Sequence, residues 1–155
     1  MDTNTWAFIF FYGNIFIVLI VFLTRIDKSR IKELITIGML SGLINYTVEI
    51  IGVHYEFWYY PLTHLGYPKI TVISSLLYFP AIAMLFYQYL SQSLIKNIFL
   101  VAGFVGYNMI IEIITLTTTR LFIYGRFLNL FITFTMYLST YIFIILFRYI
   151  YKQIP

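Results

Sequence analysis

The sequence contains no cysteine and few charged residues. Without cysteine, the chain can form neither a disulfide nor a thiolate metal site. Charged side chains make up 10% of the 155 residues, whereas a soluble domain carries about 25%. Hydrophobic residues make up 61% and are gathered in long runs, which so short a chain cannot cover with its own polar residues. The composition therefore predicts an integral membrane protein and excludes a soluble globular domain.

Five apolar segments have lengths that suit a membrane crossing. Each is close to the ~20 residues needed to span a hydrocarbon core of ~30 Å. They cover residues 6–23, 31–53, 70–90, 97–117 and 127–147. The sequence thus predicts an all-α bundle of five transmembrane helices, with residues 1–155 forming one domain and the lipid bilayer as its surroundings.

Basic residues are divided unequally between the two sides of this expected bundle. The side with the first loop, the third loop and the C-terminal tail has seven, and the other side has three: Arg25, Lys28, Arg30, Lys32, Lys96, Arg148 and Lys152 against Lys69, Arg120 and Arg126. Because cytoplasmic loops carry the excess of Lys and Arg, we expect the N-terminus outside and the C-terminus in the cytoplasm of a cell-membrane protein. The net charge of +4 then reflects topology, and no nucleic-acid partner is expected.

Two of the expected spans share a polar signature. Asn45 and Glu49 lie in the second span, and Asn108 and Glu112 lie in the fourth. Four residues of helix turn through about 400°, so each Asn and its Glu share one helix face. A charged side chain at mid-bilayer costs about 2.5–3.5 kcal/mol on insertion scales. These four residues are therefore the candidate ligand site, and the matching pattern suggests an internal repeat of two helices.

Two interpretations of the carboxylates stay open at this point. In the first, each Glu pairs with Arg120, Arg126, a Tyr or an Asn and holds the bundle together. In the second, both form the polar end of an outward-facing cavity that binds a cation, a proton or a polar headgroup. Arg120 and Arg126 are candidate site residues under either interpretation.

Small residues and a proline indicate how the helices pack. Gly38 and Gly42 form a small-xxx-small pattern that lets two helices approach closely, and self-association through them is one use of that pattern. Pro80 lies in the middle of the third span, where it should kink the helix and free the carbonyl of Leu76.

The outer loop, residues 54–69, is densely aromatic and should lie at the membrane interface as an aromatic belt or as a lid over the carboxylates. His54 and Glu56 are further candidate site residues, and with His64 they could supply three zinc ligands. Their spacing matches no specific zinc motif, so no metal is predicted. Phosphate-binding, nucleophile-elbow and HExxH motifs do not occur, so no cofactor is predicted either.

Several segments together resemble a family of small multi-spanning membrane proteins from spore-forming Gram-positive bacteria, most of them of unknown function. The resemblance lies in the basic first loop, in Trp58-Tyr59-Tyr60-Pro61 leading to Tyr78-Phe79-Pro80, and in the region from Glu112 through Ile123-Tyr124 to Arg148-Tyr149. Where the family often has a Trp, this chain has Gly125-Arg126-Phe127. The resemblance implies a multi-pass membrane fold and brings no established activity.

Three functions are compatible with these features. The favoured one is a protein without enzymatic activity, either binding a lipid or small solute at the polar site or serving as a homo-oligomer or subunit of a membrane complex. The second is an intramembrane enzyme that acts on an isoprenoid or lipid with paired carboxylates, aided by aromatic rings that stabilise a cation. The third is a channel or transporter subunit in which Glu49 and Glu112 select or couple ions.

Overall fold

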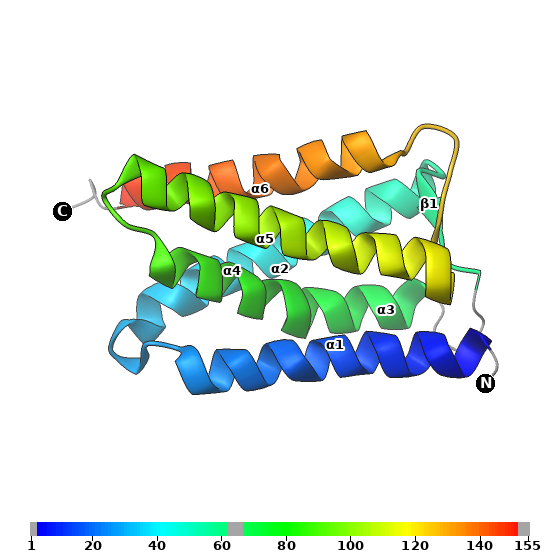
Figure 1. Cartoon of the computed structure of the whole chain (residues 1–155), viewed down its shortest axis with the longest axis horizontal. Coiled ribbons are helices and arrows are strands. Elements are labelled where there is room, and N and C mark those ends of the chain that lie inside the picture. The colour runs from blue at the N-terminus through cyan, green and yellow to red at the C-terminus, as the bar shows by residue number, and fades with distance from the viewer. Residues whose placement is uncertain (1–2, 62–66, 152–155) are drawn as a thin grey trace.

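The computed structural model of the chain describes residues 3–61 and 67–151, which form an elongated bundle of helices (Figure 1). The elements in chain order are α1 (Thr3–Arg25), η1 (Lys28–Arg30), α2 (Ile31–His54), β1 (Trp58–Tyr59), α3 (Tyr67–Ile73), η2 (Ser74–Tyr78), α4 (Phe79–Tyr89), α5 (Leu94–Ile114), η3 (Thr115–Thr119), β2 (Ile123–Tyr124) and α6 (Leu130–Tyr151). The turns η2 and η3 are π-helical, so α3, η2 and α4 form one continuous helix and η3 continues α5.

The predicted number of long helices is confirmed. In the described part of the chain, five helices are long and apolar enough to cross a membrane. Two of them begin where a side chain caps the first turn. The Ser93 hydroxyl accepts the Lys96 N–H (3.5 Å), and Asn129 Oδ1 accepts the Ile132 N–H (3.0 Å), so the fourth helix starts earlier than expected and the fifth starts later.

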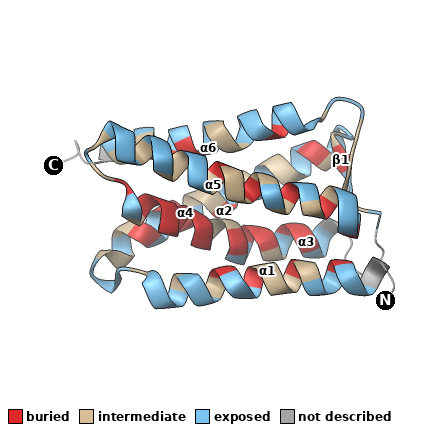
Figure 2. Ribbon diagram, in the orientation of Figure 1, coloured by how far each residue is buried: buried red, intermediate tan, exposed pale blue. Residues whose placement is uncertain are grey.

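The third long helix is the centre of the bundle. Its residues are mostly buried, whereas only about a fifth of the residues in each of the other four long helices are buried (Figure 2). It packs against α1, α2, α5 and α6, with Phe86 and Tyr87 fully enclosed. The surrounding helices turn large apolar side chains outward, as expected where lipid covers them.

The central helix is irregular next to Pro80. The proline lies two residues after the π-helical segment η2, at whose end the Phe79 N–H bonds to the Ser74 carbonyl. Proline has no N–H and its ring clashes with the carbonyl four residues earlier. A π-turn accommodates such a disruption by widening the helix locally.

Gly38 and Gly42 of α2 face the central helix, and Gly42 lies against its widened segment. A Cβ on Gly42 would lie 2.4 Å from the Ser75 carbonyl oxygen, and one on Gly38 would lie 2.9 Å from the end of Met84. Both glycines are thus buried against the central helix of their own chain. Self-association through Gly38 and Gly42 would have to displace that helix, so a homo-oligomer would need another surface.

One small strand pair departs from the predicted all-α architecture. Strands β1 and β2 pair antiparallel, with Trp58 opposite Tyr124 and Tyr59 opposite Ile123. We call residues 58–59 and 123–124 the clasp. It lies at the end of the bundle where the chain begins, and the chain ends at the opposite end (Figure 1).

Candidate functional site

Glu49, on α2, is held by two aromatic donors from the segment that follows its own helix. Its Oε2 atom accepts hydrogen bonds from the Tyr60 hydroxyl (2.7 Å) and the Trp58 indole N–H (3.1 Å). One turn earlier, the Asn45 amide donates to the Ser75 hydroxyl (2.8 Å) of the central helix. The Oε1 atom of Glu49 accepts no hydrogen bond from the described residues, so half of this carboxylate keeps its acceptor capacity.

Glu112, on α5, is held in a similar way and is more deeply buried, with 7% of its surface exposed. Its Oε1 accepts from the Tyr124 hydroxyl (2.9 Å) of the clasp, and its Oε2 accepts from the Tyr137 hydroxyl (2.8 Å) of α6. The Tyr124 hydroxyl also lies 3.0 Å from the Thr133 hydroxyl. Each oxygen of this carboxylate therefore has one neutral donor.

Asn108 lies one turn below Glu112 and joins three helices. Its carbonyl oxygen accepts from the Tyr78 hydroxyl (3.2 Å) of the central helix, and its amide donates to the Tyr141 hydroxyl of α6. A buried amide with partners on both ends fixes the relative position of the helices that supply them. Asn108 is therefore a structural contact at the base of the site.

The clasp connects the two carboxylates. Trp58 bonds Glu49 while its opposite partner Tyr124 bonds Glu112. After each helix that carries a carboxylate, the chain passes through a residue with positive φ before it enters its short strand: Glu56 (φ 56°), two residues after α2, and Arg120 (φ 50°), directly after η3. The two halves thus repeat one design, in which a helix with Asn-x-x-x-Glu is followed by a residue with positive φ and then by a strand with an aromatic donor.

Two glycines make this geometry possible. A Cβ on Gly52 would lie 2.1 Å from the Trp58 ring, and one on Gly125 would lie 1.8 Å from the Glu56 carbonyl oxygen. The Gly125 N–H donates to the Phe57 carbonyl (2.7 Å) and so extends the clasp by one bond. Both positions exclude any larger residue unless the clasp moves.

The tyrosines of the two loops remain protonated donors. Burial, followed by the charge of Glu49, raises the pKa of Tyr60 well above its usual value. Burial also raises the pKa of Tyr124. Because a neutral phenol keeps its proton at physiological pH, both hydroxyls donate to the carboxylates.

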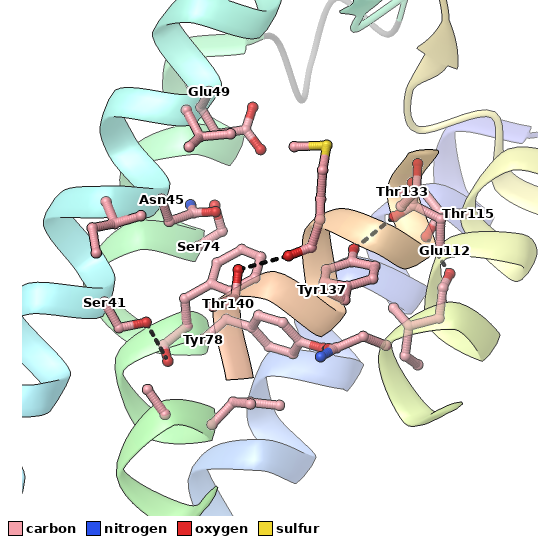
Figure 3. A pocket seen from close by; sticks show the side chains of 18 of the residues that line it. Ser41, Asn45, Glu49, Ser74, Tyr78, Glu112, Thr115, Thr133, Tyr137 and Thr140 are labelled. Atoms are coloured by element: carbon pink, nitrogen blue, oxygen red, sulfur yellow. Dashed lines mark hydrogen bonds between the residues drawn. The ribbon is translucent and has the colours of Figure 1, made fainter. Parts of the chain in front are cut away.

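A cavity of about 660 Å³ extends from these carboxylates along the bundle (Figure 3). Asn45, Glu49, Asn108 and Glu112 all line it. Ile37 and Glu49 of α2 both border the cavity and are 12 positions apart, which corresponds to about 18 Å of helix. Most of the lining between the carboxylate end and the far end is aliphatic or aromatic, so the cavity has one polar end and a long apolar body.

The cavity is open on one side, between α2 and α6. Ile132, Met136 and Phe143 follow one stripe of α6 that lines the cavity, yet 38%, 36% and 44% of their surfaces are exposed. On the other rim, Leu40, Ile44 and Val48 of α2 are half-buried. The two helices that flank the opening do not pack closely against each other. The opening therefore lies along the side of the bundle that lipid would cover.

The remaining candidate site residues lie elsewhere. His54, Glu56, Arg120 and Arg126 are exposed, and neither arginine forms an ion pair with Glu49 or Glu112. Tyrosine and tryptophan hold the carboxylates instead. No group of three or more metal-ligating side chains occurs in the described part of the chain, and His64 of the considered zinc set lies outside the described residues.

The sequence interpretation included a tyrosine among the possible partners of each Glu, but it did not identify the four donors Trp58, Tyr60, Tyr124 and Tyr137. Their aromatic character was visible, but tyrosine and tryptophan are also typical of any membrane interface. The signal that could have found them is the count of buried carboxylate oxygens, because each requires a donor and the sequence places no cation inside a span near either Glu.

Comparison with models of protein families, with curated proteins and with solved structures gives no significant match to any of them. The resemblance to membrane proteins of spore-forming bacteria therefore stays a prediction. Function has to be argued from the cavity itself.

Proposed function

We propose that this protein binds a lipid-like amphiphile in the plane of a cell membrane, with the ligand's polar head at Glu49 and Glu112 and its apolar chain along α6. The observation that carries the proposal is the cavity, which is polar at one end, apolar along its body and open toward the side of the bundle. Its volume is in the range of cavities that hold small-molecule ligands.

The opening between α2 and α6 favours entry from the bilayer. Most residues on its rim are apolar, although Thr135, Ser139 and Thr140 of α6 also lie there, and the outer faces of both helices expose large apolar side chains. A molecule dissolved in lipid can reach the cavity without crossing water, whereas a polar solute would have to pass these mostly apolar rims. The length of the cavity from Ile37 to Glu49, about 18 Å along α2, suits an extended hydrocarbon chain with a polar head.

The two carboxylates favour a head that donates hydrogen bonds. Glu49 has an oxygen without a donor from the described residues, and its side chain points into the cavity (Figure 3). All donors that hold the two carboxylates are neutral groups, so the site carries no internal cation to compensate them. An amine or hydroxyl head would complete these contacts, and an anionic head would be repelled.

A set of single-chain probes tests the proposal directly. The purified, delipidated protein is titrated with oleylamine, oleyl alcohol and oleate, and binding is measured by native mass spectrometry. We expect oleylamine to bind most tightly, the alcohol next and oleate least. The Glu49→Gln variant should lose about tenfold in oleylamine affinity, since it removes a charge-assisted contact.

Two matched controls separate the cavity from the surface. Glu56→Gln removes an exposed carboxylate and should bind oleylamine as the native chain does. Ile44→Trp fills the cavity and should block all three probes, while Leu43→Trp, on the exposed face of the same helix, should not. Equal effects of the two Trp variants, or preference for oleate, would overturn the proposal.

One further observation supports an enzymatic alternative. Thr133, Tyr124, Glu112 and Tyr137 form a continuous chain of hydrogen bonds, and such a chain could move a proton to an isoprenoid or lipid in the same cavity. Lipid and isoprenoid profiles of membranes with the native chain and with Glu112→Gln distinguish the two functions. A product that depends on Glu112 would favour the enzyme, and unchanged profiles would favour binding alone.

A further inference from the structure

A second cluster of charged residues lies at the opposite end of the bundle from the clasp. Its centre is Tyr87, a fully buried residue of α4. The guanidinium carbons of Arg30 and Arg148 each lie 5.7 Å from the centroid of the Tyr87 ring. The Tyr87 hydroxyl donates to Glu33 Oε1 (2.6 Å). One tyrosine therefore orients two arginines from different parts of the chain, one directly before α2 and one near the end of α6.

The guanidinium groups of the two arginines differ in the hydrogen-bond acceptors available to them. Arg30 forms an ion pair with Glu33 (2.9 Å) and also donates to the Gln88 carbonyl (3.3 Å). Arg148 is half-buried, and its Nη1 atom is buried without any hydrogen-bond partner in the described part of the chain. A buried guanidinium donor without an acceptor is costly. Arg148 thus has a requirement for an acceptor that the neighbouring side chains do not meet.

The place of this cluster indicates which acceptor would reach it. Arg148 belongs to α6 and Arg30 is the residue directly before α2, so both lie at the ends of the two helices that flank the lateral opening. Phe147, the residue before Arg148, lines the end of the cavity that is remote from the carboxylates. Arg25, Lys28 and Lys32 lie at the same end of the bundle and make it strongly basic. An anion that arrives along the lipid-covered side would therefore meet a positive field and an unsatisfied donor.

We propose that Arg148, with Arg30 beside it, binds the phosphate group of an anionic membrane lipid at the end of the bundle where the chain terminates. The planar guanidinium fork matches a phosphate with two parallel hydrogen bonds, and basic pockets between membrane helices are typical sites for lipid headgroups. The ring of Tyr87 orders both guanidinium groups before the lipid arrives, which reduces the entropy lost on binding. This site is separate from the carboxylate site and does not depend on the function proposed above.

The test compares lipids that differ only in headgroup charge. The delipidated full chain in neutral detergent is titrated with dioleoyl phosphatidylglycerol and with dioleoyl phosphatidylcholine, and binding is followed by native mass spectrometry and by the rise in melting temperature. For the native chain we expect at least about tenfold tighter binding of phosphatidylglycerol. Arg148→Gln should abolish this preference, and Arg148→Lys, which keeps the charge and loses the fork, should fall between them.

Arg25→Gln is the matched control, because Arg25 is an exposed arginine at the same end of the bundle. It removes one charge and should leave the preference for phosphatidylglycerol unchanged. An equal loss in Arg25→Gln and Arg148→Gln would overturn the proposal in favour of a diffuse surface charge. Unchanged binding in Arg148→Gln would overturn it as well. If Arg148→Gln does not fold, Arg148→Lys decides the question. A preference for phosphatidylglycerol equal to that of the native chain in Arg148→Lys would overturn the proposal.

Inorganic phosphate separates a lipid headgroup from a soluble anion. The phosphatidylglycerol titration is repeated in sodium phosphate and in sodium chloride of the same ionic strength. We expect the lipid to bind equally in both, because its chains add apolar contacts that free phosphate lacks. If millimolar phosphate alone raises the melting temperature and displaces the lipid, the site is one for a soluble phosphate group, and its assignment to a lipid is wrong.

Discussion

Gly52 carries no functional group, yet it decides where the indole of Trp58 lies. A Cβ at position 52 would lie 2.1 Å from that ring, so Gly52→Ala has to displace the indole and weaken its hydrogen bond to Glu49. Forcing a methyl group into such a contact costs about 1–3 kcal/mol. We expect Gly52→Ala to lower the free energy of unfolding by about that amount, measured by Trp58 fluorescence during unfolding in a Trp6→Phe background.

Gly103→Ala is the matched control for this substitution. Gly103 also lies in a long helix, but a Cβ there would have no atom within 4 Å. Replacing glycine by alanine in a helix interior gains up to about 1 kcal/mol, so this variant should be as stable as the native chain or more so. The contact between Gly52 and Trp58 would be refuted if both alanine variants had the same stability.

At the scale of single residues, the sequence singled out Glu49 and Glu112 but did not identify the side chains that donate hydrogen bonds to them. The spacing of Asn45 and Glu49, repeated in Asn108 and Glu112, put each pair on one helix face, and all four residues line the cavity. A tyrosine was one of the partners considered for each carboxylate, but the sequence did not show which one, and Trp58 and Tyr124 reach their carboxylates through the pairing of the two loops. Arg120 was expected near a carboxylate through its charge, but its place in the fold is set by its left-handed backbone at a helix end.

At the scale of elements, the apolar runs predicted the number and approximate position of the long helices. The starts of the last two were missed by about three residues, because the caps at Ser93 and Asn129 set them and were not considered. The clasp was not predicted, because two-residue strands have no periodicity and form only through contacts between residues 64 and 66 positions apart. The π-turn η2 was foreseen only as a kink at Pro80.

Because the chain contains no cysteine, the register of the clasp can be tested with an introduced cysteine pair. Tyr59 and Ile123 lie opposite each other in the strand pair, where Cα atoms are about 4.5–5.5 Å apart. This separation is within the range that a disulfide spans. We therefore expect the double variant Tyr59→Cys with Ile123→Cys to form an intramolecular disulfide on mild oxidation, detected by loss of maleimide labelling and by mass spectrometry of proteolytic fragments.

A displaced cysteine pair controls for loop flexibility. Tyr59→Cys with Phe127→Cys moves the second thiol four residues beyond Ile123, to an exposed side chain outside the clasp. This pair should stay largely reduced under the same oxidation. Equal cross-linking of both pairs would mean that the two loops move freely past each other and would contradict the register of the clasp.

At the scale of the whole molecule, the central position of the third long helix shapes the site. Four helices surround it, but α2 and α6 do not close against each other, and the cavity lies in the resulting gap. Hydropathy alone could not identify this arrangement, because all five spans are similarly apolar. The order of helices around the centre depends on local fit, such as Gly42 against the widened turn at Ser75.

The unequal distribution of basic residues predicts how the bundle is oriented in the membrane. The clasp and the N-terminal end of α1 lie at one end of the molecule, and the basic loop η1 lies at the other (Figure 1). Because the positive-inside rule places the more basic end in the cytoplasm, we expect the clasp to face outward. Single cysteines in this cysteine-free chain test it, with Phe127→Cys near the clasp and Gln92→Cys in the loop at the far end, both exposed.

In intact cells, a membrane-impermeant maleimide should label Phe127→Cys and spare Gln92→Cys until the membrane is permeabilised. The opposite pattern would place the carboxylate end of the cavity toward the cytoplasm and the Arg148 cluster toward the outside. Labelling of both cysteines in intact cells would mean a dual orientation, which a bias of seven basic residues to three should prevent. Because the lipids of the two leaflets differ, this one measurement also decides which leaflet supplies the phosphate group at Arg148.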